Sequence, residues 1–161
     1  MKVIDKTLMD ELCAKAAASP RLRAHHNLHE SLDAPIHRLI MAGVKGTYIR
    51  PHRHFCTQKT EFFTILRGHG AVLTFSDSGV IRHRYELVPG GKTVAVELEP
   101  NEWHTFFPLS DEVVVSEVKA GPYVATPEQD FAQWSPAEGT PEAGDFVRWF
   151  RVAAEGEAKH L

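Results

Sequence analysis

The stretch from Gly46 to Gly68, which reads GTYIRPHRHFCTQKTEFFTILRG, contains the pattern that decides the fold. His52 and His54 stand two positions apart, and Glu61 begins the apolar run that follows. Side chains alternate across a β-strand, so an extended run over 46–54 would point both imidazoles the same way, about 6–7 Å apart. Imidazole and carboxylate are ligands that transition metals prefer. The stretch therefore predicts a metal site carried by β-strands.

A third imidazole comes from a distant part of the chain, Pro100–Phe107, which reads PNEWHTFF. Asn101 suits the left-handed turn before a strand, and His104 would lie at the start of that strand. Three neutral imidazoles and one carboxylate form a ligand set that leaves room for water or a substrate oxygen. The sequence thus predicts an open site for one divalent transition metal, with iron, manganese, nickel and zinc all possible. The predicted ligands are His52, His54, Glu61 and His104.

These residues resemble the two sequence motifs of the cupin superfamily. The first motif is matched by Gly46, His52, His54, Glu61 and Gly68, and the second by Pro100–His104. In cupins such residues surround a metal inside a small antiparallel jelly-roll barrel, and the resemblance implies the same arrangement here. The chain departs from the usual motifs in two places: the gap between His54 and Glu61 is longer, and Asn101 replaces a glycine.

Segments outside the barrel motifs resemble the WbuC-like cupin metalloproteins over most of the chain. They are residues 19–21, 27–29, 37–40, 50–54, 66–68, 103–105, 117–123 and 130–139. That family is associated with surface-polysaccharide gene clusters. The resemblance therefore implies a ligand that is a sugar or nucleotide sugar, and it supports the fold and the metal more directly than any reaction.

Short strand-like runs separated by turn residues predict an all-β protein, a single small jelly-roll barrel with short N-terminal and C-terminal helices. The runs are 36–42, 46–54, 61–67, 70–76, 80–88, 92–98, 103–108 and 112–119. We expect one domain with three parts. These parts are an N-terminal helix and extended arm at 1–35, the cupin barrel at 36–120, and a C-terminal loop and helix packing on the barrel at 121–161.

The two helices are predicted from caps and periodicity. Asp5 is an N-cap candidate, and apolar side chains recur every four residues through 5–18. Asp145 is expected to cap the last helix, whose aromatic stripe indicates a core or dimer contact. The stripe consists of Phe146, Trp149, Phe150 and Ala153.

Composition limits the functional classes. The 161 residues include 43% hydrophobic and 24% charged residues, with a formal net charge of −3, which is ordinary for one soluble domain. Nothing in this balance favours nucleic acid or a membrane as a partner. The acidic N-terminal sequence lacks the apolar stretch of a signal peptide, and Cys13 and Cys56 form no disulfide pattern. We therefore expect a cytoplasmic protein, and a homodimer is compatible with the aromatic C-terminal stripe.

Further side chains are candidates for ligand binding. Tyr48 and Arg50 share the parity of the histidines and could bind a hydroxylated or anionic ligand, unless Tyr48 packs and Arg50 pairs with Glu117. Arg38 is a third substrate-binding candidate, and His29 could belong to the same pocket. Cys56 is interpreted as a small packed residue and not as a metal ligand.

Three functional classes are compatible with such a site. A metal-dependent isomerase or epimerase would use the ion as a Lewis acid and would need a separate proton acceptor, for which Tyr48 and His29 are the candidates. A non-haem iron dioxygenase would use the same ligand types. A non-catalytic module would bind or sense a small molecule with the help of the metal.

Overall fold

The computed structural model describes residues 1–159, so the last two positions of the predicted C-terminal segment 121–161 lie outside the described residues. The strands are β1 (Arg23–Asn27), β2 (Ile36–Val44), β3 (Glu61–Phe75), β4 (Ile81–Leu87), β5 (Ala95–Leu98) and β6 (Trp103–Ala120). The helices are α1 (Lys6–Ala18), the short 3-10 helix η1 (Glu128–Asp130) and α2 (Pro141–Val152). The predicted all-β class with a short helix at each end is confirmed.

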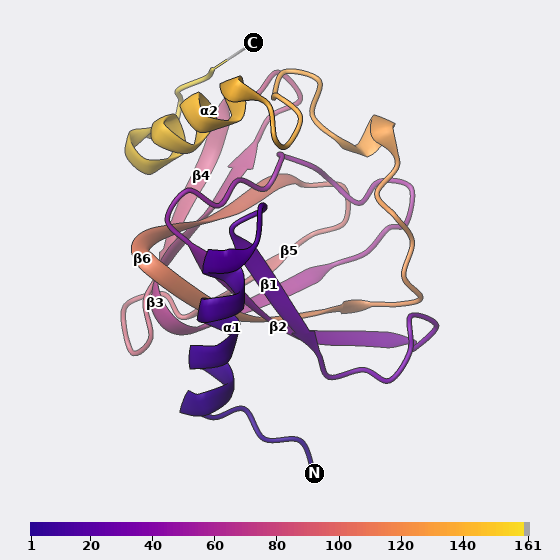
Figure 1. Ribbon diagram of the computed structural model, residues 1–161. Coiled ribbons are helices and arrows are strands. Elements are labelled where there is room, and N and C mark those ends of the chain that lie inside the picture. Colours follow the sequence, from indigo (N-terminus) through magenta and orange to yellow (C-terminus); the bar gives the residue numbers. More distant parts are fainter. Residues whose placement is uncertain (160–161) are drawn as a thin grey trace.

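All strand pairs are antiparallel, in the order β1-β2-β6-β3-β4, with β5 pairing with β3. The sheet curves around its own core into a small barrel, with α1 in front of it and α2 above it in the view of Figure 1. The three-part division at residues 35 and 120 stays a prediction.

Two pairs of predicted strands are in fact single long strands. The runs 61–67 and 70–76 join in β3, and the runs 103–108 and 112–119 join in β6. The predicted turn at Gly68 is a bulge, where the register between β3 and β6 shifts. Gly68 has φ +77°, and a Cβ there would lie 2.2 Å from the carbonyl oxygen of Glu112. A bulge lets one strand continue through a bend where a turn would have ended it.

The predicted strand at 46–54 is wrong as a regular strand. In this segment only His52 forms β-bridges, one to His104 and one to Phe131. Pro51 has no backbone N–H to give to a ladder, which limits pairing. The Pro51 carbonyl instead accepts a hydrogen bond from the N–H of Ala132 (2.9 Å). The histidine segment is therefore held between the start of β6 and the loop after η1.

The N-terminal helix is close to its prediction. Asp5 caps it by accepting a hydrogen bond from the N–H of Leu8 (3.0 Å), and Leu12 and Ala16 are buried. The region 21–34, expected to be extended or irregular, contains the edge strand β1, which pairs with β2.

The last helix begins earlier than predicted. Thr140 is the N-cap and Pro141 the first helical residue, whereas Asp145 lies inside the helix. Proline suits this position because the first helical N–H has no partner within the helix. Phe146 and Phe150 are buried, so at least part of the aromatic stripe belongs to the core.

Strand alternation divides the core into three clusters. One fills the barrel interior and consists of Met41, Phe63, Ile65, Val72, Leu87, Leu98, Phe106, Val113 and Val115. A second lies under α2 and includes Leu73, Phe75, Phe107, Phe146 and Phe150, and a third lies under α1 and includes Leu12, Ala16, Ile40, Ala42 and Val114. Helices α1 and α2 therefore cover outer faces of the sheet, while apolar side chains pack the barrel interior.

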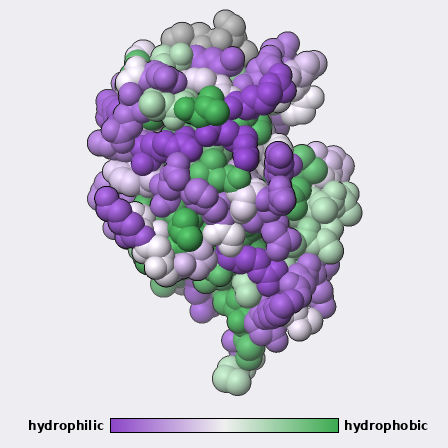
Figure 2. All heavy atoms as spheres, turned by 90° about the vertical axis from the view of Figure 1, so that its left-hand side faces the viewer, coloured by the Kyte–Doolittle hydropathy of each residue, from purple (hydrophilic) through white to green (hydrophobic). Residues whose placement is uncertain are grey.

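The face shown in Figure 2 is mostly hydrophilic, with apolar side chains scattered in small groups. In the described part of the chain, no helix combines the length and apolar character needed to cross a membrane.

Candidate metal centre

His52 and His54 are positioned by backbone hydrogen bonds on both sides of their segment. The N–H of His52 donates to the carbonyl oxygen of His104 (3.0 Å), and the N–H of His104 donates to that of His52 (2.9 Å). On the other side, the N–H of Arg53 donates to the carbonyl oxygen of Asp130 (2.9 Å). Two short bridges thus replace the regular strand that the sequence suggested, and they still bring His52 against His104.

Glu61 and His104 come from the two central strands of the barrel. Glu61 is the first residue of β3, and His104 is the second residue of β6. Both side chains are buried, at 2% and 3% exposure, so the apolar interior surrounds them. The Nε2 atom of His104 lies 3.1 Å from Oε2 of Glu61.

The structure brings the four predicted ligands together. His52, His54, Glu61 and His104 each offer one ligand atom, and these atoms lie within 4.8 Å of one another. The rings of His52 and His104 are 4.4 Å apart between centroids, and that of His54 lies 5.2 Å from His52. Strand β3 and strand β6 each contribute one member, and the segment before β3 contributes two.

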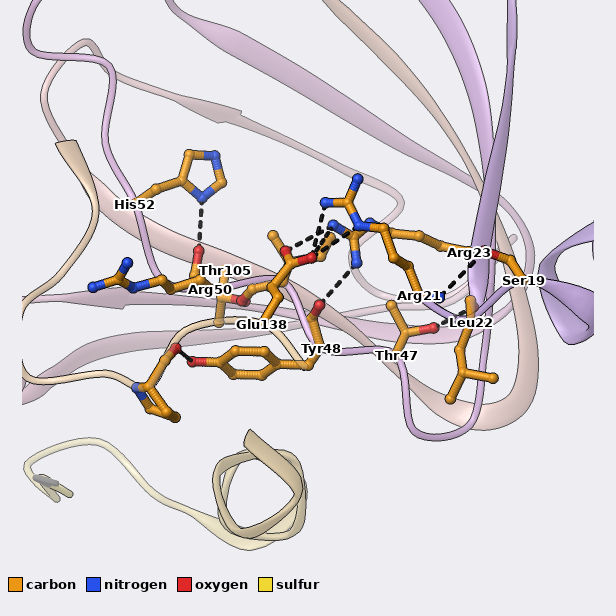
Figure 3. Close-up of polar contacts among 12 residues, drawn as sticks. Ser19, Arg21, Leu22, Arg23, Thr47, Tyr48, Arg50, His52, Thr105 and Glu138 are labelled. Atoms are coloured by element: carbon orange, nitrogen blue, oxygen red, sulfur yellow. Dashed lines mark hydrogen bonds and ion pairs between the residues drawn. The ribbon is translucent and has the colours of Figure 1, made fainter. Parts of the chain in front are cut away.

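Backbone carbonyls orient two of the imidazoles. Nδ1 of His52 lies 3.0 Å from the carbonyl oxygen of Arg50, as Figure 3 shows, and Nδ1 of His104 lies 2.8 Å from that of Glu102. A carbonyl only accepts, so each Nδ1 carries the proton and donates it. Nε2 is therefore the atom of each ring that would bind a metal, which is the usual arrangement for a metal-binding histidine, and in the metal-free protein Nε2 of His104 contacts Oε2 of Glu61 instead.

The donor set fits a divalent transition metal. Nε2 of His54 is buried and has no hydrogen-bond partner, although it lies 3.0 Å from Oε1 of Glu61. A buried polar atom without a partner is costly, and a metal ion would supply one. Three nitrogens and one carboxylate suit iron, manganese, nickel or zinc, and the ligand types alone do not select among them.

The electrostatics differ between His52 and His104. Burial, together with the neighbouring His104, lowers the pKa of His52 to about 3 against the opposing effect of Glu61. Burial also acts to lower the pKa of His104, but the hydrogen bond and charge of Glu61 outweigh it and raise the pKa. His52 is thus neutral near pH 7, while His104 holds a proton more tightly than an ordinary histidine.

A lysine links Glu61 to a second buried acid. Nζ of Lys119 lies 2.8 Å from Oε1 of Glu61 and 2.6 Å from Oε1 of Glu117. Burial acts to raise the pKa of Glu61, but the charge of Lys119 and the hydrogen bond from His104 hold it well below its usual value. Burial and the charge of Glu61 raise the pKa of Glu117 to about 7. The positive charge of Lys119 is therefore shared between a candidate metal ligand, Glu61, and an acid outside the ligand set, Glu117.

A cavity of about 450 Å³, the chamber, lies on the same side of the barrel as this lysine. Its walls come from β1, β2, β6 and the loops beside them: His25, Asn27, His29, Leu32, His37, Leu39, Met41, Glu117, Lys119 and Tyr123. A smaller cavity of about 50 Å³ is lined by His54 and shares Lys119, His37 and Tyr123 with the chamber. The ligand cluster and the chamber are thus neighbours through Lys119 and the space beside His54.

Tyr48 does not share the direction of the histidines, and this corrects the parity argument. Its hydroxyl donates to a backbone carbonyl oxygen (Figure 3), that of Pro136 (2.9 Å). Its ring packs in the cluster under α2, 6.1 Å from the ring of Phe150. The alternation assumed for 46–54 does not hold because the segment is not a regular strand. Tyr48 lines neither the chamber nor the cavity beside His54, so its placement gives no support to a catalytic role.

Arg50 is paired, but with an acid other than the one expected. Its Nη1 lies 3.1 Å from Oε1 of Glu128, and its Nη2 donates to the carbonyl oxygen of Ala132 (3.2 Å). The guanidinium also lies 5.1 Å from the centre of the Phe131 ring. Arg50 thus binds the loop after η1 to the histidine segment, and the suggested pairing with Glu117 is wrong.

Arg38 and His29 are in contact through the backbone of Arg38, but only His29 lines the chamber. Arg38 is exposed and lies on the opposite face of β2 from His37 and Leu39, which line the chamber, so it gains no support as a substrate-binding residue. His29 is buried, lines the chamber and stacks on His37 with ring centroids 4.0 Å apart. The arm that carries His29 therefore contributes to the chamber wall.

Sequence reasoning missed the acid–lysine pair and the residue that anchors the histidine loop. Glu117 and Lys119 alternate in β6 around Val118, and this parity could have indicated a common face. Asp130, at 1% exposure, accepts a hydrogen bond from the N–H of Cys56 (3.1 Å). No local pattern marks Asp130, because its partner lies 74 residues away.

Comparison with known proteins gives a family and a fold. Residues 4–87, slightly more than half of the chain, match the protein family described as "Domain of unknown function (DUF6016)". None of the curated proteins matches the sequence.

Several solved structures share the fold. A cupin-2 domain protein from Rhodospirillum rubrum has a TM-score of 0.55 and 16% identity, with 83% of this chain and 84% of that chain covered. A cupin 2 domain-containing protein from Halorhodospira halophila has a TM-score of 0.52 and 15% identity, covering 84% of this chain and 85% of that one. A cupin 2 conserved barrel domain protein from Rhodopseudomonas palustris has a TM-score of 0.50 and 17% identity, covering 77% and 78%. The predicted small jelly-roll barrel is thus confirmed as the fold, which this chain shares with these cupin proteins.

Proposed function

We propose, from the premise that this chain belongs to the family described as "Domain of unknown function (DUF6016)", that the protein is a metal-dependent enzyme acting on a sugar or nucleotide sugar. The observation that carries the proposal is the convergence of four ligand atoms within 4.8 Å of one another inside a cupin fold. A chamber beside them offers space for a small molecule. Isomerisation or epimerisation is the proposed reaction.

Four residues would hold the ion, namely His52, His54, Glu61 and His104. His52, His54 and His104 present Nε2 atoms, and Glu61 presents its carboxylate. When bound, a divalent transition metal supplies Lewis-acid polarisation of a substrate carbonyl or hydroxyl oxygen. The apolar interior cluster next to the site limits access of water, which strengthens the electrostatic interactions there.

Isomerisation also requires a group that accepts and returns a proton. Glu117 is the carboxylate that lines the chamber without being a candidate metal ligand, and it is 7% exposed. His29 lines the same chamber from the N-terminal arm. We assign proton transfer to Glu117, at its carboxylate oxygens, and ligand binding to His29, in place of the role that parity suggested for Tyr48.

The finer family assignment is part of this proposal. The segments outside the barrel motifs resemble the WbuC-like cupin metalloproteins, and this resemblance supports a role in surface-polysaccharide metabolism. The cytoplasmic location and the homodimer belong to the same proposal. Light scattering after size-exclusion chromatography measures the oligomeric state directly, and the mass of a monomer would contradict the proposed homodimer.

Two measurements test the proposal. The first is the metal content of protein purified without added metal, with one ion per chain expected. The second is NMR detection of product from monosaccharides and nucleotide sugars incubated with that protein. Glu117→Gln is expected to keep the metal and lose turnover, whereas Glu86→Gln, an exposed acid in β4, should keep both.

The same measurements separate the alternatives. Iron in the preparation together with oxygen uptake and no isomerised product would favour a dioxygenase. Thermal stabilisation by a ligand with no turnover of any substrate would favour a binding or sensing module. Absence of bound metal under all loading conditions would overturn both enzymatic functions.

A further inference from the structure

We propose that the chamber binds one unphosphorylated, hydroxylated molecule of single-sugar size, and that it selects against sugar phosphates and nucleotide sugars. The inference rests on the proposed function in that the chamber is taken as the ligand site beside the metal. It narrows the substrate class through the size, charge and polar lining of this cavity.

Size is the first argument. The chamber has a volume of about 450 Å³, which equals about 15 water molecules at their share of liquid volume. Ligand pockets commonly measure about 300–1,000 Å³, so this one belongs to the small end of the range. A monosaccharide with a few bridging waters fits, whereas a nucleotide sugar would have to leave its nucleotide outside.

Charge is the second argument. Among the described residues that line the chamber there is one lysine, Lys119, and no arginine. Its ammonium already pairs with Glu117 at 2.6 Å and with Glu61 at 2.8 Å. Phosphate groups are bound by arginine forks, free lysines or helix N-termini. A phosphate here would instead meet a carboxylate and a cation that is already neutralised.

Other arginines near the barrel do not supply the missing charge. Arg21 and Arg23 line a separate cavity under α2, and both pair with Glu138, at 2.9 Å and 2.7 Å (Figure 3). That cavity shares no lining residue with the chamber. The two guanidinium groups are thus committed to holding the C-terminal loop against the N-terminal arm.

The polar lining is the third argument, and His29 carries it. Nδ1 of His29 lies 3.1 Å from the N–H of Arg38 and 3.0 Å from the carbonyl oxygen of Arg38. A backbone N–H can only donate, so Nδ1 accepts the hydrogen bond from Arg38 and carries no proton. The proton then lies on Nε2, which is buried and has no partner. An unpaired donor in the chamber wall suits a neutral ligand oxygen.

Strand β1 adds two polar side chains to the chamber wall, next to two apolar side chains of β2. His25 is paired in register with Met41 and Asn27 with Leu39, so all four share the interior face. His26 lies between them on the opposite face and does not line the chamber. Amide and imidazole groups above two aliphatic side chains match the hydroxyl groups and the carbon face of a sugar.

The matched pair Asn27→Leu and His26→Leu tests the proposal, because both positions are exposed and lie in the same edge strand. The full chain, loaded with zinc, is titrated by NMR and calorimetry with glucose, xylose, glucuronate, glucose 6-phosphate and UDP-glucose. We expect at least one unphosphorylated sugar to bind more tightly than both phosphorylated compounds. Asn27→Leu should weaken that binding about tenfold by removing a hydrogen-bonding group, and His26→Leu should leave it unchanged.

Three results would overturn the inference: tighter binding of glucose 6-phosphate or UDP-glucose, binding of none of the sugars, or equal weakening by both variants. Repeating the titration after EDTA treatment separates this inference from the proposed function. If the protein fails to take up zinc again after EDTA treatment but still binds sugar, the chamber is supported as the sugar site and the proposed metal-dependent enzyme is contradicted. Full zinc content without sugar binding would support the metal site and contradict the chamber as the sugar site.

Discussion

Nε2 of His104 lies 3.1 Å from Oε2 of Glu61, although 43 residues separate them in the chain. In the ladder between β3 and β6, Glu61 lies opposite Lys119 and His104 lies opposite Thr74, so the two residues stand at opposite ends of the ladder and reach each other because the sheet curves into a barrel. Their contact places the carboxylate among the imidazoles and raises the pKa of His104 against the opposing effect of burial. The metal-ligand cluster therefore depends on the curvature of the two longest strands, which brings their first residues together inside the barrel.

Replacing a ligand should remove the metal and spare the fold. His52→Ala and His104→Ala are each expected to reduce bound metal to a small fraction of the wild-type content, because a ligand set of three holds the ion far less tightly. The strands are stabilised by their own apolar clusters, so circular dichroism should show a folded barrel. Elemental analysis measures the metal, and His69→Ala, at a half-buried histidine outside the cluster, serves as the control. Full metal content in both variants would disprove the ligand assignment.

Metal binding should become stronger as pH rises through the histidine range. His52, with a pKa of about 3, is already unprotonated there, whereas the raised pKa of His104 means that a metal must displace its proton. We expect proton release on binding, larger below pH ~6.5 than at pH ~8. Calorimetry in buffers of different ionisation enthalpy measures it. A pH-independent affinity would contradict the assignment of His104 Nε2 as a ligand.

The metal-free protein has a matching dependence of stability on pH. A raised pKa in the folded state means that His104 stabilises the fold below its ordinary value near 6.5, and that this contribution is lost as pH rises through the raised value. The lowered pKa of Glu61 works in the opposite direction, since its contribution is present above about 4.5 and is lost as pH falls through the lowered value. Considering Glu61 and His104 alone, the free energy of unfolding should be highest between about pH 4.5 and about pH 6.5. Urea unfolding after EDTA treatment at several pH values measures it.

Removing the cation between two buried acids should destabilise the metal-free protein strongly. Lys119→Met leaves Glu61 and Glu117 without their shared partner, and we expect a loss of about 3 kcal/mol in the free energy of unfolding. Metal should restore part of this loss, because the ion then neutralises Glu61. Urea unfolding with and without zinc measures both effects. Lys92→Met, at an exposed lysine, is the control, and an equal effect there would contradict the role of Lys119.

The loop that carries the histidines should loosen when its anchor is removed. Asp130→Ala deletes the acceptor for the N–H of Cys56 and the charge 3.8 Å from Nε of Arg53. We expect about a tenfold loss of metal affinity, as for other residues that orient metal ligands indirectly. Competition with a chelator measures the affinity. Glu142→Ala, at an exposed acid in α2, should change it little, and the opposite ranking would contradict the anchoring role.

Tyr48 should matter for stability and not for turnover. Tyr48→Phe removes the hydrogen bond to the carbonyl oxygen of Pro136, with an expected loss of about 1 kcal/mol in unfolding free energy. The ring and its packing against Phe150 remain. Thermal unfolding and turnover are measured on the same preparation. Unchanged stability with lost turnover would restore Tyr48 as a catalytic residue.

The sequence alone was sufficient for the ligand types, the strand-rich fold and the N-terminal helix. His52, His54, Glu61 and His104 stand beside turn residues and apolar runs whose period is readable locally. The helix at residues 6–18 is likewise encoded by a cap and a four-residue repeat. Such features depend on neighbours within a few positions, so they can be predicted without knowing the contacts between distant segments.

Tertiary structure alone decided which further side chains surround the site. Whether Tyr48 points with the histidines depended on regular pairing of 46–54, and the bridges to His104 and Phe131 replaced that pairing. Lys119 could be assigned to two acids only after β6 was placed against β3, and Asp130 only after its loop was folded over residue 56. Contacts between distant segments are set by strand register and barrel closure, and no local periodicity encodes them.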